Sequence, residues 1–396
     1  MNAPLYQADT VIIGTGMAGI TLARELRKLD SETSIALITG DDGAVYSKPM
    51  ISNAFAQGKS IEDLVQKNAD QLSEDLNAQV WTGAQVTAIN RMDKAVIVNT
   101  AEGRDVIGYG NLVLAIGAKP RPYEVEGSAA VALPAVNSLQ DYANWREGLD
   151  EEASENTRVL IIGAGLIGTE FANDLAGSGY HVDVVDPAPH PLSRLLPDDL
   201  GQLMQDALNE IGVRFHMGQV VTGVTAGENG NVARLDDGSR ITFDHALTAI
   251  GLVANTELAQ DASLDVNQGI KVDGFLRTSD PDIYALGDCA ETDAGMLPYI
   301  LPLMAEARAL AQTLVGNPTH VVLPALPVAV KTPALPAVVC PPKPGSEGAW
   351  VIEGSGIDHR ALFVSPDGET LGFALTGQET KARQALAKDM PGLLAA

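Results

Sequence analysis

The stretch that decides the fold is "TVIIGTGMAGITLARELRKLD", residues 10–30. An apolar run leads into Gly14, Gly16 and Gly19, and the glycines open a segment with apolar residues at helical spacing. A strand, a glycine loop and a helix in this order are typical of a dinucleotide-binding unit. In such a unit the first glycine allows a tight turn, the second lets a pyrophosphate approach the backbone, and the third lets helix and strand pack closely.

The same pattern occurs a second time, in "RVLIIGAGLIGTEFANDLAGSG", residues 158–179, with Gly163, Gly165 and Gly168. Two copies, each after a strand and before a helix, predict two dinucleotide sites in one chain. Another pair, "LVLAIGAKP" at 112–120 and "ALTAIGLVAN" at 246–255, brackets the second copy with two strands that end in Ala-Ile-Gly. We therefore expect the second unit to be inserted into the first.

The composition describes a globular protein of 396 residues with 45% hydrophobic and 19% charged residues. Its net charge of −25 makes nucleic acid or an anionic membrane surface an improbable partner. No apolar run is long enough to span a bilayer, and the N-terminus lacks the basic segment of a signal peptide. We therefore expect a cytoplasmic protein without membrane insertion. Two cysteines and six scattered histidines form no metal-spaced set, so no metal site is predicted.

Acidic residues at strand ends are candidates to bind the adenosine ribose. After the first fingerprint, "ALITGDDG" supplies Asp41, with Asp42 in reserve, and after the second, "VDVVDP" supplies Asp186. A carboxylate at the ribose position repels a 2′-phosphate, so Asp186 favours NADH over NADPH. Arg194, eight residues later, keeps NADPH open as an alternative.

Two dinucleotides in one chain imply hydride transfer from one to the other, which indicates a flavin fed by a nicotinamide. The stretch "IYALGDCAE", residues 283–291, is then a strand ending in Gly-Asp opposite the first fingerprint. There Asp288 can aim its carboxylate at a ribityl hydroxyl of FAD, while Cys289 should point away as a small buried residue. The following helical segment, residues 299–316, can direct its N-terminal N–H groups at reduced flavin.

The predicted fold class is α/β, with two Rossmann-like dinucleotide-binding domains, the NAD domain inserted into the FAD domain, and a C-terminal α+β domain. The composition changes to proline-rich short strands after Gly316-Asn317-Pro318. The predicted domain limits are 1–118 with 250–320 for FAD, 119–249 for NAD, and 321–396 for the C-terminal domain.

The motifs resemble those of the pyridine nucleotide–disulfide oxidoreductase superfamily, in its single-flavin branch without a redox disulfide. The stretches "VYSKPMIS", "GLIGTEFANDLAGSGY", "TSDPDIYALGDCAE" and "VAVKTP" closely resemble bacterial rubredoxin–NAD reductases. Disulfide members of the superfamily carry one or two cysteines after the first unit, where this chain has "AVYSKPMISNAF" and none. The resemblance therefore implies that electrons leave directly from the flavin, without a thiol relay.

The same resemblance implies roles for particular residues. Lys48 and Glu170 are expected to act in catalysis, Lys48 near the isoalloxazine and Glu170 between nicotinamide and flavin. Val86 should meet the adenine, and Ile300 and Lys331 the flavin. In full, the residues expected to bind FAD are Gly14, Thr15, Gly16, Met17, Ala18, Gly19, Asp41, Asp42, Lys48, Pro49, Val86, Ala115, Gly117, Glu170, Gly287, Asp288, Ile300 and Lys331. Those expected to bind NAD are Gly163, Gly165, Leu166, Ile167, Gly168, Asp186 and Gly251.

The function that the resemblance implies is an NADH:rubredoxin oxidoreductase. It would take a hydride from NADH onto FAD and pass single electrons to rubredoxin in a transient complex, feeding an alkane hydroxylase or a similar chain. The alternatives are a flavorubredoxin reductase in nitric oxide detoxification, a ferredoxin reductase of an aromatic dioxygenase and, from another class, a non-enzymatic NADH-sensing flavoprotein. The expected oligomeric state is a monomer or weak homodimer.

Overall fold

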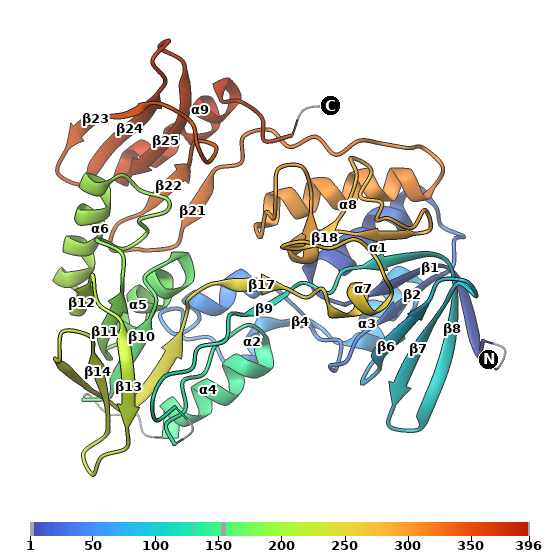
Figure 1. Cartoon of the computed structure of the whole chain (residues 1–396), viewed down its shortest axis with the longest axis horizontal. Helices are drawn as coiled ribbons and strands as arrows, with labels where there is room; N and C mark the ends of the chain where they lie inside the picture. Colours follow the sequence, from blue (N-terminus) through green and yellow to red (C-terminus); the bar gives the residue numbers. More distant parts are fainter. Residues whose placement is uncertain (1–3, 129, 152–155, 395–396) are drawn as a thin grey trace.

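The computed structural model describes residues 4–128, 130–151 and 156–394. The first unit is built on a seven-stranded sheet of order β5-β2-β1-β8-β7-β6, with β19 also paired to β8 (Figure 1). The strands β5, β2, β1, β8 and β19 run parallel, while β6 and β7 add an antiparallel extension to β8. The bounds are β1 Tyr6–Ile13, β2 Ile35–Ile38, β5 Gln79–Trp81, β6 Gln85–Asn90, β7 Ala95–Thr100, β8 Gly103–Leu114 and β19 Ile283–Ala285.

Helices cover the first sheet because the apolar stripe of each helix faces the buried strands. On one face α1, α3 and α8 pack in a core around Leu22, Leu37 and Leu310. On the other face the sheet packs against α7 and the segment that leads into β19. The helix bounds are α1 Met17–Leu29, α3 Ala69–Leu76, α7 Glu257–Asp261 and α8 Ile300–Leu314.

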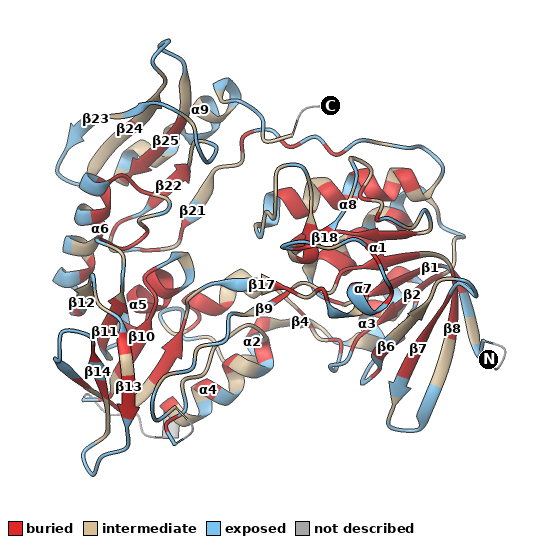
Figure 2. Cartoon of the chain, viewed as in Figure 1, coloured by how far each residue is buried: buried red, intermediate tan, exposed pale blue. Residues whose placement is uncertain are grey.

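The second unit repeats this plan with a four-stranded parallel sheet of order β12-β11-β10-β16. Helices α4, α5 and α6 cover one face, and the antiparallel sheet β13-β14-β15 covers the other. Figure 2 shows its central strands, β10 and β11, buried over most of their length. The bounds are β10 Arg158–Ile162, β11 His181–Asp186, β12 Val213–Met217, β13 Val221–Thr225, β14 Asn231–Leu235, β15 Arg240–Phe243, β16 His245–Thr248, α4 Leu139–Glu151, α5 Leu166–Gly177 and α6 Asp198–Glu210. The predicted α/β class is confirmed.

The chain passes between the two units twice, as β9 (Ala118–Pro120) and β17 (Leu252–Ala254), which pair antiparallel. Reciprocal backbone hydrogen bonds hold this crossing, Arg121 N–H to Gly251 O and Asn255 N–H to Gly117 O, both 3.0 Å long. The strands that directly follow the two Ala-Ile-Gly repeats therefore lie side by side. The domain limits given above stay a prediction.

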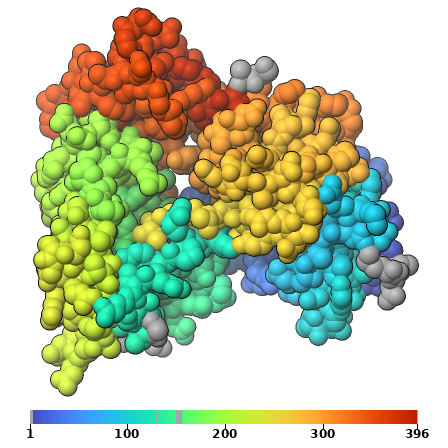
Figure 3. Space-filling model, viewed as in Figure 1, coloured from blue at the N-terminus to red at the C-terminus, as the bar shows by residue number. Residues whose placement is uncertain are grey.

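The C-terminal unit is a five-stranded antiparallel sheet of order β21-β22-β25-β24-β23. A long segment after α8 leads to it (Figure 1). Its inner face shares one continuous core with the second unit, in which Val330 and Ala374 belong to the same cluster as Phe171 and Leu200. Figure 3 shows this unit stacked on the second unit, with a gap separating much of it from the first. The bounds are β21 Val328–Val330, β22 Ala337–Cys340, β23 Ala349–Ser355, β24 Asp358–Val364, β25 Thr370–Thr376, η3 Gly377–Ala382 and α9 Arg383–Asp389.

Short elements complete the first unit around its carboxyl edge. Among them the 3₁₀ helix η1 (Lys48–Asn53) packs against α5 of the second unit and so links the two. The remaining bounds are β3 Val45–Tyr46, α2 Ile61–Leu64, β4 Val65–Lys67, β18 Ile270–Lys271, η2 Gly287–Cys289 and β20 Ala290–Glu291.

Candidate active site

The first glycine of each fingerprint sits where only glycine fits. Gly14 has φ +112° and Gly163 has φ +109°, in the region that other residues rarely adopt. A Cβ atom on Gly14 would lie 2.3 Å from the carbonyl oxygen of Ala115, and one on Gly163 would lie 2.5 Å from that of Ala249. Each fingerprint loop therefore turns tightly against the end of the neighbouring parallel strand.

The second and third glycines also have matching surroundings in both loops. A Cβ atom on Gly16 or Gly165 would meet nothing within 4 Å, so this side of each loop is open at the helix N-terminus. A Cβ atom on Gly19 or Gly168 would lie about 2 Å from the carbonyl oxygen of the first glycine, 2.0 Å and 1.9 Å respectively. An open backbone at a helix N-terminus, braced by close packing behind it, fits a pyrophosphate. Both loops therefore fit the dinucleotides that the sequence predicts.

The carboxyl edge of the first sheet brings most of the predicted FAD residues together. Strands β1, β2, β8 and β19 are parallel, so the segments that follow them meet at one edge. The residues placed there are Gly14, Thr15, Gly16, Met17, Ala18, Gly19, Asp41, Asp42, Ala115, Gly117, Gly287 and Asp288. Two further predicted residues stand at the starts of helices. Ile300 is the first residue of α8, and Pro49 is the second residue of η1.

Asp41 and Asp42 are both exposed after β2 and both stabilise the turn there. The Asp41 carboxylate accepts hydrogen bonds from Thr39 Oγ1 at 2.6 Å and from the Gly43 N–H at 3.0 Å. Asp42 accepts one from the Ala44 N–H at 3.0 Å. The Gly83 N–H donates to Asp41 O, which brings the start of β6, and with it Val86, to this turn. The ribose roles of the two acids stay a prediction.

Lys48 and Asp288 are two partly enclosed charges of opposite sign that act on each other. Burial lowers the pKa of the Lys48 ammonium, and the negative charges of Asp288 and Asp141 oppose this shift. Burial likewise raises the pKa of Asp288, with Lys48 opposing. Lys48 Nζ donates to Asn137 Oδ1 at 2.5 Å, and Asn137 Nδ2 donates to Ala118 O at 2.9 Å. Asn137, which the sequence reading missed, therefore ties this lysine to the chain crossing.

Cys289 is fully buried behind the turn that carries Asp288. Its Sγ lies 3.3 Å from Leu114 O and 3.4 Å from Leu286 O, and burial raises its pKa to about 12. A thiol in this state is a packing residue and not a nucleophile. The expectation that Cys289 turns away as a small buried residue agrees with this burial, and the contact of Asp288 with FAD stays a prediction.

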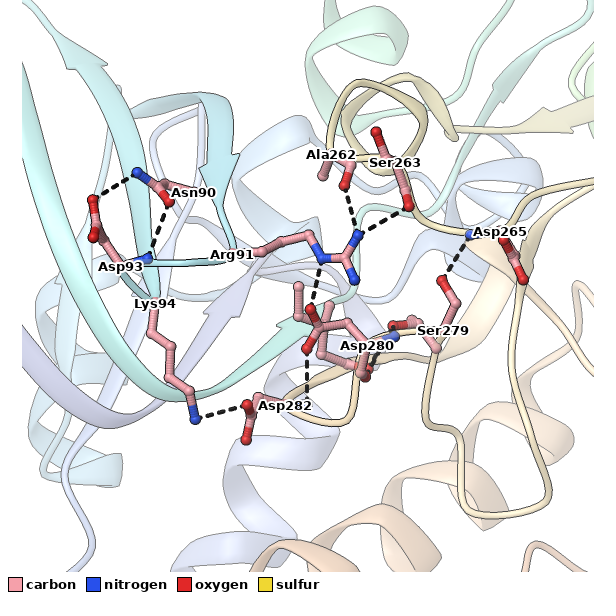
Figure 4. A network of polar contacts seen from close by, with 12 residues as sticks. Asn90, Arg91, Asp93, Lys94, Ala262, Ser263, Asp265, Ser279, Asp280 and Asp282 are labelled. Atoms are coloured by element: carbon pink, nitrogen blue, oxygen red, sulfur yellow. Dashed lines mark hydrogen bonds and ion pairs between the residues drawn. The ribbon is translucent and has the colours of Figure 1, made fainter.

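A clamp around Arg91 holds the loop that leads into β19 (Figure 4). The Arg91 guanidinium donates to Asp280 Oδ2 at 2.6 Å and to the carbonyl oxygens of Ala262 and Ser263 at 3.3 and 3.1 Å. Nearby, Lys94 pairs with Asp282 at 2.7 Å. The acids of the "TSDPD" motif thus fasten this loop to the turn between β6 and β7, and so help to place the strand that ends at Asp288.

Glu170 lies where the three units meet. Its side chain is 1% exposed, and its carboxylate accepts from Ser52 Oγ of η1 at 2.7 Å and from the Lys331 N–H at 3.0 Å. Lys331 Nζ forms an ion pair with the same carboxylate and donates to Ser52 Oγ at 2.9 Å. Asn53 Nδ2 adds a bond to Lys331 O at 3.2 Å. The structure therefore pairs Glu170 with Lys331 and Ser52, while Lys48 bonds elsewhere.

Two further buried polar residues on α5 extend this junction. Asn173 Oδ1 accepts from the Ala334 N–H at 3.1 Å. Asp174 accepts from the N–H groups of Phe55 and Ala56 at 3.0 and 2.9 Å, and burial raises its pKa to about 6. The sequence reading missed both residues. The signal was present, since Asp174 follows Phe171 and Glu170 at the i+3 and i+4 spacing of one helix face.

At the second fingerprint Asp186 ends β11 beside the glycine loop. Its carboxylate accepts from the Ala164 N–H at 2.7 Å and from the Ala188 N–H at 2.8 Å, which orients it at the mouth of the loop. Leu166 and Ile167 open α5 beside Gly165, whereas Gly251 lies at the chain crossing with φ +102°. Arg194 is exposed, and the NADPH alternative that it keeps open is not decided by its position.

The segment after Asp186 is locked by His190, which is buried. The imidazole bonds to Pro191 O at 2.9 Å and to Asp198 Oδ1 at 3.1 Å. It fits because residue 201 is glycine, where a Cβ atom would lie 1.8 Å from His190 Nδ1. This lock holds the loop that frames the predicted ribose site.

Comparison with known proteins places the chain in a family. Residues 8–313 match the model of the pyridine nucleotide-disulphide oxidoreductases, and residues 320–390 match that of a rubredoxin binding C-terminal domain. The chain therefore belongs to the pyridine nucleotide-disulphide oxidoreductase family, as the motifs predicted. It is an enzyme, an oxidoreductase whose cofactors are FAD and NADH.

Individual relatives match over nearly the whole chain. A rubredoxin-NAD(+) reductase of Alcanivorax borkumensis is 45% identical, covering 97% of this chain and 99% of the relative. A nitric oxide reductase FlRd-NAD(+) reductase of Vibrio vulnificus is 37% identical over 93% of this chain and 94% of the relative. The solved structure of a ferredoxin reductase from Rhodopseudomonas palustris superposes with a TM-score of 0.86 at 26% identity, covering 97% of this chain and 95% of that one.

Within the described parts of the chain, no helix has the length and apolar character needed to cross a membrane.

Proposed function

We propose that this chain is an NADH:rubredoxin oxidoreductase, which carries electrons from NADH through FAD to the iron protein rubredoxin. The observation that carries the proposal is the C-terminal unit. Residues 320–390 match a rubredoxin binding domain, and the same unit delivers Lys331 to the junction with Glu170 and Ser52. A surface that recognises the acceptor is thus connected through one lysine to the centre of the molecule.

The residues of the site divide the work of holding two nucleotides. The glycine loops at Gly16 and Gly165 present open backbone to the two pyrophosphates, and Asp288 offers a carboxylate to the ribityl chain. Lys48 supplies a positive charge opposite Asp288, and its depressed pKa reflects the low dielectric of the site. The chemistry that a bound flavin supplies is the conversion of a two-electron donor into one-electron steps.

The Glu170 junction keeps the facing parts of the three units in fixed register. Lys331 Nζ donates to the carboxylate of Glu170 and to the hydroxyl of Ser52, and the Lys331 carbonyl oxygen accepts a hydrogen bond from Asn53 Nδ2. Glu170 lies on α5, the helix whose N-cap is Gly165, and it bonds to Ser52 of η1, the helix that begins at Lys48. A nucleotide bound at the loop around Gly165 is therefore positioned relative to η1 and Lys48. Fixed orientation of donor and acceptor groups is the main contribution that a protein makes to such a transfer.

The burial of both cysteines supports a route in which electrons leave the flavin directly, without a thiol relay. Cys289 is 0% exposed and Cys340 is 6% exposed, and burial raises their pKa values to about 12 and about 11. Cys289 ends η2, which follows β19, and Cys340 ends β22 of the C-terminal sheet. Neither thiol is available as a nucleophile in the neutral range.

A second candidate is a flavorubredoxin reductase, which the Vibrio vulnificus relative at 37% identity favours. A ferredoxin reductase is a third, favoured by the fold of the Rhodopseudomonas palustris enzyme.

Among finer features, we propose a cytoplasmic protein, a monomer or weak homodimer, with no nucleic-acid or membrane partner and a role in alkane degradation or a similar electron-transfer chain. Because the chain carries a net charge of −25, docking of an acidic carrier would use a local patch, for which Lys48, Arg121 and Lys343 are candidates.

The test is steady-state NADH oxidation by the purified holoenzyme with three acceptors: a rubredoxin, the rubredoxin module of a flavorubredoxin, and a [2Fe–2S] ferredoxin. We expect the highest kcat/KM with free rubredoxin. A much higher value with ferredoxin would move the chain to the ferredoxin reductases. Slow turnover with every acceptor, including an artificial one-electron acceptor, would favour the NADH-sensing alternative.

The thiol prediction needs a separate control. A Cys289→Ala, Cys340→Ala double variant should reduce rubredoxin as the unmodified enzyme does, and neither protein should reduce glutathione disulfide or coenzyme A disulfide. Efficient disulfide turnover by either protein would contradict the proposed route.

A further inference from the structure

Glu306 is a buried acid that the site described above does not use. It lies on α8, is 3% exposed, and falls between Leu303 and Leu310, which belong to the apolar core of the first unit. An ionisable group in such surroundings is costly unless it makes a specific hydrogen bond. The contact that Glu306 makes therefore indicates what the residue is for.

That contact is with the turn that carries Asp288. Glu306 Oε2 accepts a hydrogen bond from the Gly287 N–H at 2.7 Å. Gly287 has φ +73°, and a Cβ atom there would lie 3.0 Å from the Ala18 side chain of α1 and 3.5 Å from that of Leu303. The turn is thus enclosed by α1 on one side and α8 on the other, and Glu306 holds the backbone N–H of Gly287.

We propose that Glu306 is a positioning residue for the flavin, which fixes the Gly287–Asp288 turn from behind and thereby sets the affinity of the chain for FAD. The inference rests on the proposed function only in that FAD binds at the first fingerprint. Glu306 acts through Asp288, because it bonds to the backbone of the preceding residue and lies in the core behind the turn.

The charge on Glu306 gives this role a measurable signature. The titratable groups that face it are Asp288 and the Cys289 thiol, both from η2, while α1 contributes the apolar Ala18. Burial raises the pKa of Glu306 to about 7; the Gly287 N–H opposes this and Asp288 adds to it. The carboxylate accepts the N–H more strongly than the neutral acid does. The turn should therefore be held more firmly at pH 8 than at pH 6.

The experiment is a titration of flavin-free protein with FAD, followed by flavin fluorescence between pH 6 and pH 8. We expect Glu306→Ala to raise the Kd for FAD about tenfold at pH 8, the loss of one charge-assisted hydrogen bond. Glu306→Gln keeps an acceptor oxygen without the charge, so its Kd at pH 8 should lie between those of the original protein and Glu306→Ala, close to the value of the original protein at pH 6. The original protein should bind FAD more weakly as the pH falls, and Glu306→Gln should show a smaller dependence, because only the contribution of Asp288 then remains.

Thr313→Val is the matched control, because it removes another buried polar group from the same helix, away from the turn. It should bind FAD as the original protein does. An unchanged Kd in Glu306→Ala, or an undiminished pH dependence in Glu306→Gln, would overturn the proposal. If Glu306→Ala does not fold, the pH profile of Glu306→Gln decides. The titration contains neither NADH nor rubredoxin, so its failure is separate from a failure of the proposed acceptor.

Discussion

The two fingerprint helices, α1 and α5, begin from the same glycine geometry and end in different surroundings. On α1 the positions that correspond to Glu170, Asn173 and Asp174, counted from the third glycine, are Thr21, Arg24 and Glu25, none of them buried. On α5 all three positions are buried and bonded to other units. A duplicated nucleotide-binding unit has thus become a connector in its second copy, because three polar side chains on one helix face bond to neighbouring units.

The largest effect is expected at the fingerprint glycines, whose geometry the two nucleotide-binding units share. Gly14→Ala and Gly163→Ala place a side chain at positive φ and within 2.5 Å of a backbone oxygen, which should destabilise the protein by more than about 3 kcal/mol. Gly16→Ala and Gly165→Ala meet open space and should leave the fold intact while weakening FAD and NADH binding respectively. Soluble yield, circular dichroism and nucleotide titration separate the two classes of variant. An equal loss of stability in all four variants would contradict the different roles given to the first and second glycines.

The next effect tests the difference between the helices. Glu170→Ala leaves Lys331 without its ion-pair partner at the junction, which should cost about 3 kcal/mol. Thr21→Ala, the matched change on α1, should cost less than about 0.5 kcal/mol. Both are measured as shifts in urea denaturation of the apoprotein. If the two variants lost similar stability, α5 would be no more a connector than α1.

A smaller effect concerns the ribose acids of the two units. Asp186→Ala should reduce the preference of kcat/KM for NADH over NADPH by about tenfold, or about 1.4 kcal/mol, because the carboxylate no longer repels a 2′-phosphate. Asp41→Ala is the control in the first unit and should leave that ratio unchanged. An NADPH preference in the unaltered enzyme would remove Asp186 from this role and would make Arg194 the candidate to bind the 2′-phosphate.

The smallest effect is an absence of reaction at the cysteine of the first unit. Because burial raises the pKa of Cys289 to about 12, its thiol stays protonated at pH 8. Alkylation by iodoacetamide should be negligible in native protein and complete in urea, read by mass spectrometry. Cys340 serves as a second buried thiol. Rapid labelling of Cys289 alone would contradict its assignment as a buried packing residue.

Much of the site could be predicted because its signals are local. The glycine loops, the Gly-Asp turn and Asp186 each follow a strand directly, so their place at a sheet edge follows from the parallel topology. Glu306 could also have been flagged, since it falls three residues after Leu303 and four before Leu310 on an apolar helix face. Ser52 and Asn137 carried no such signal, because their partners come from distant segments.

The sequence by itself determined the two nucleotide-binding units, their nesting and the family, because glycine conformations and apolar periodicity act over a few residues. Only the tertiary structure decided which lysine meets Glu170 and which backbone groups Glu306 and Asp174 bind. The bonds at the Glu170 junction join residues 118 to 279 positions apart in the chain. No local pattern encodes such distances; they result from the packing of three units around one helix.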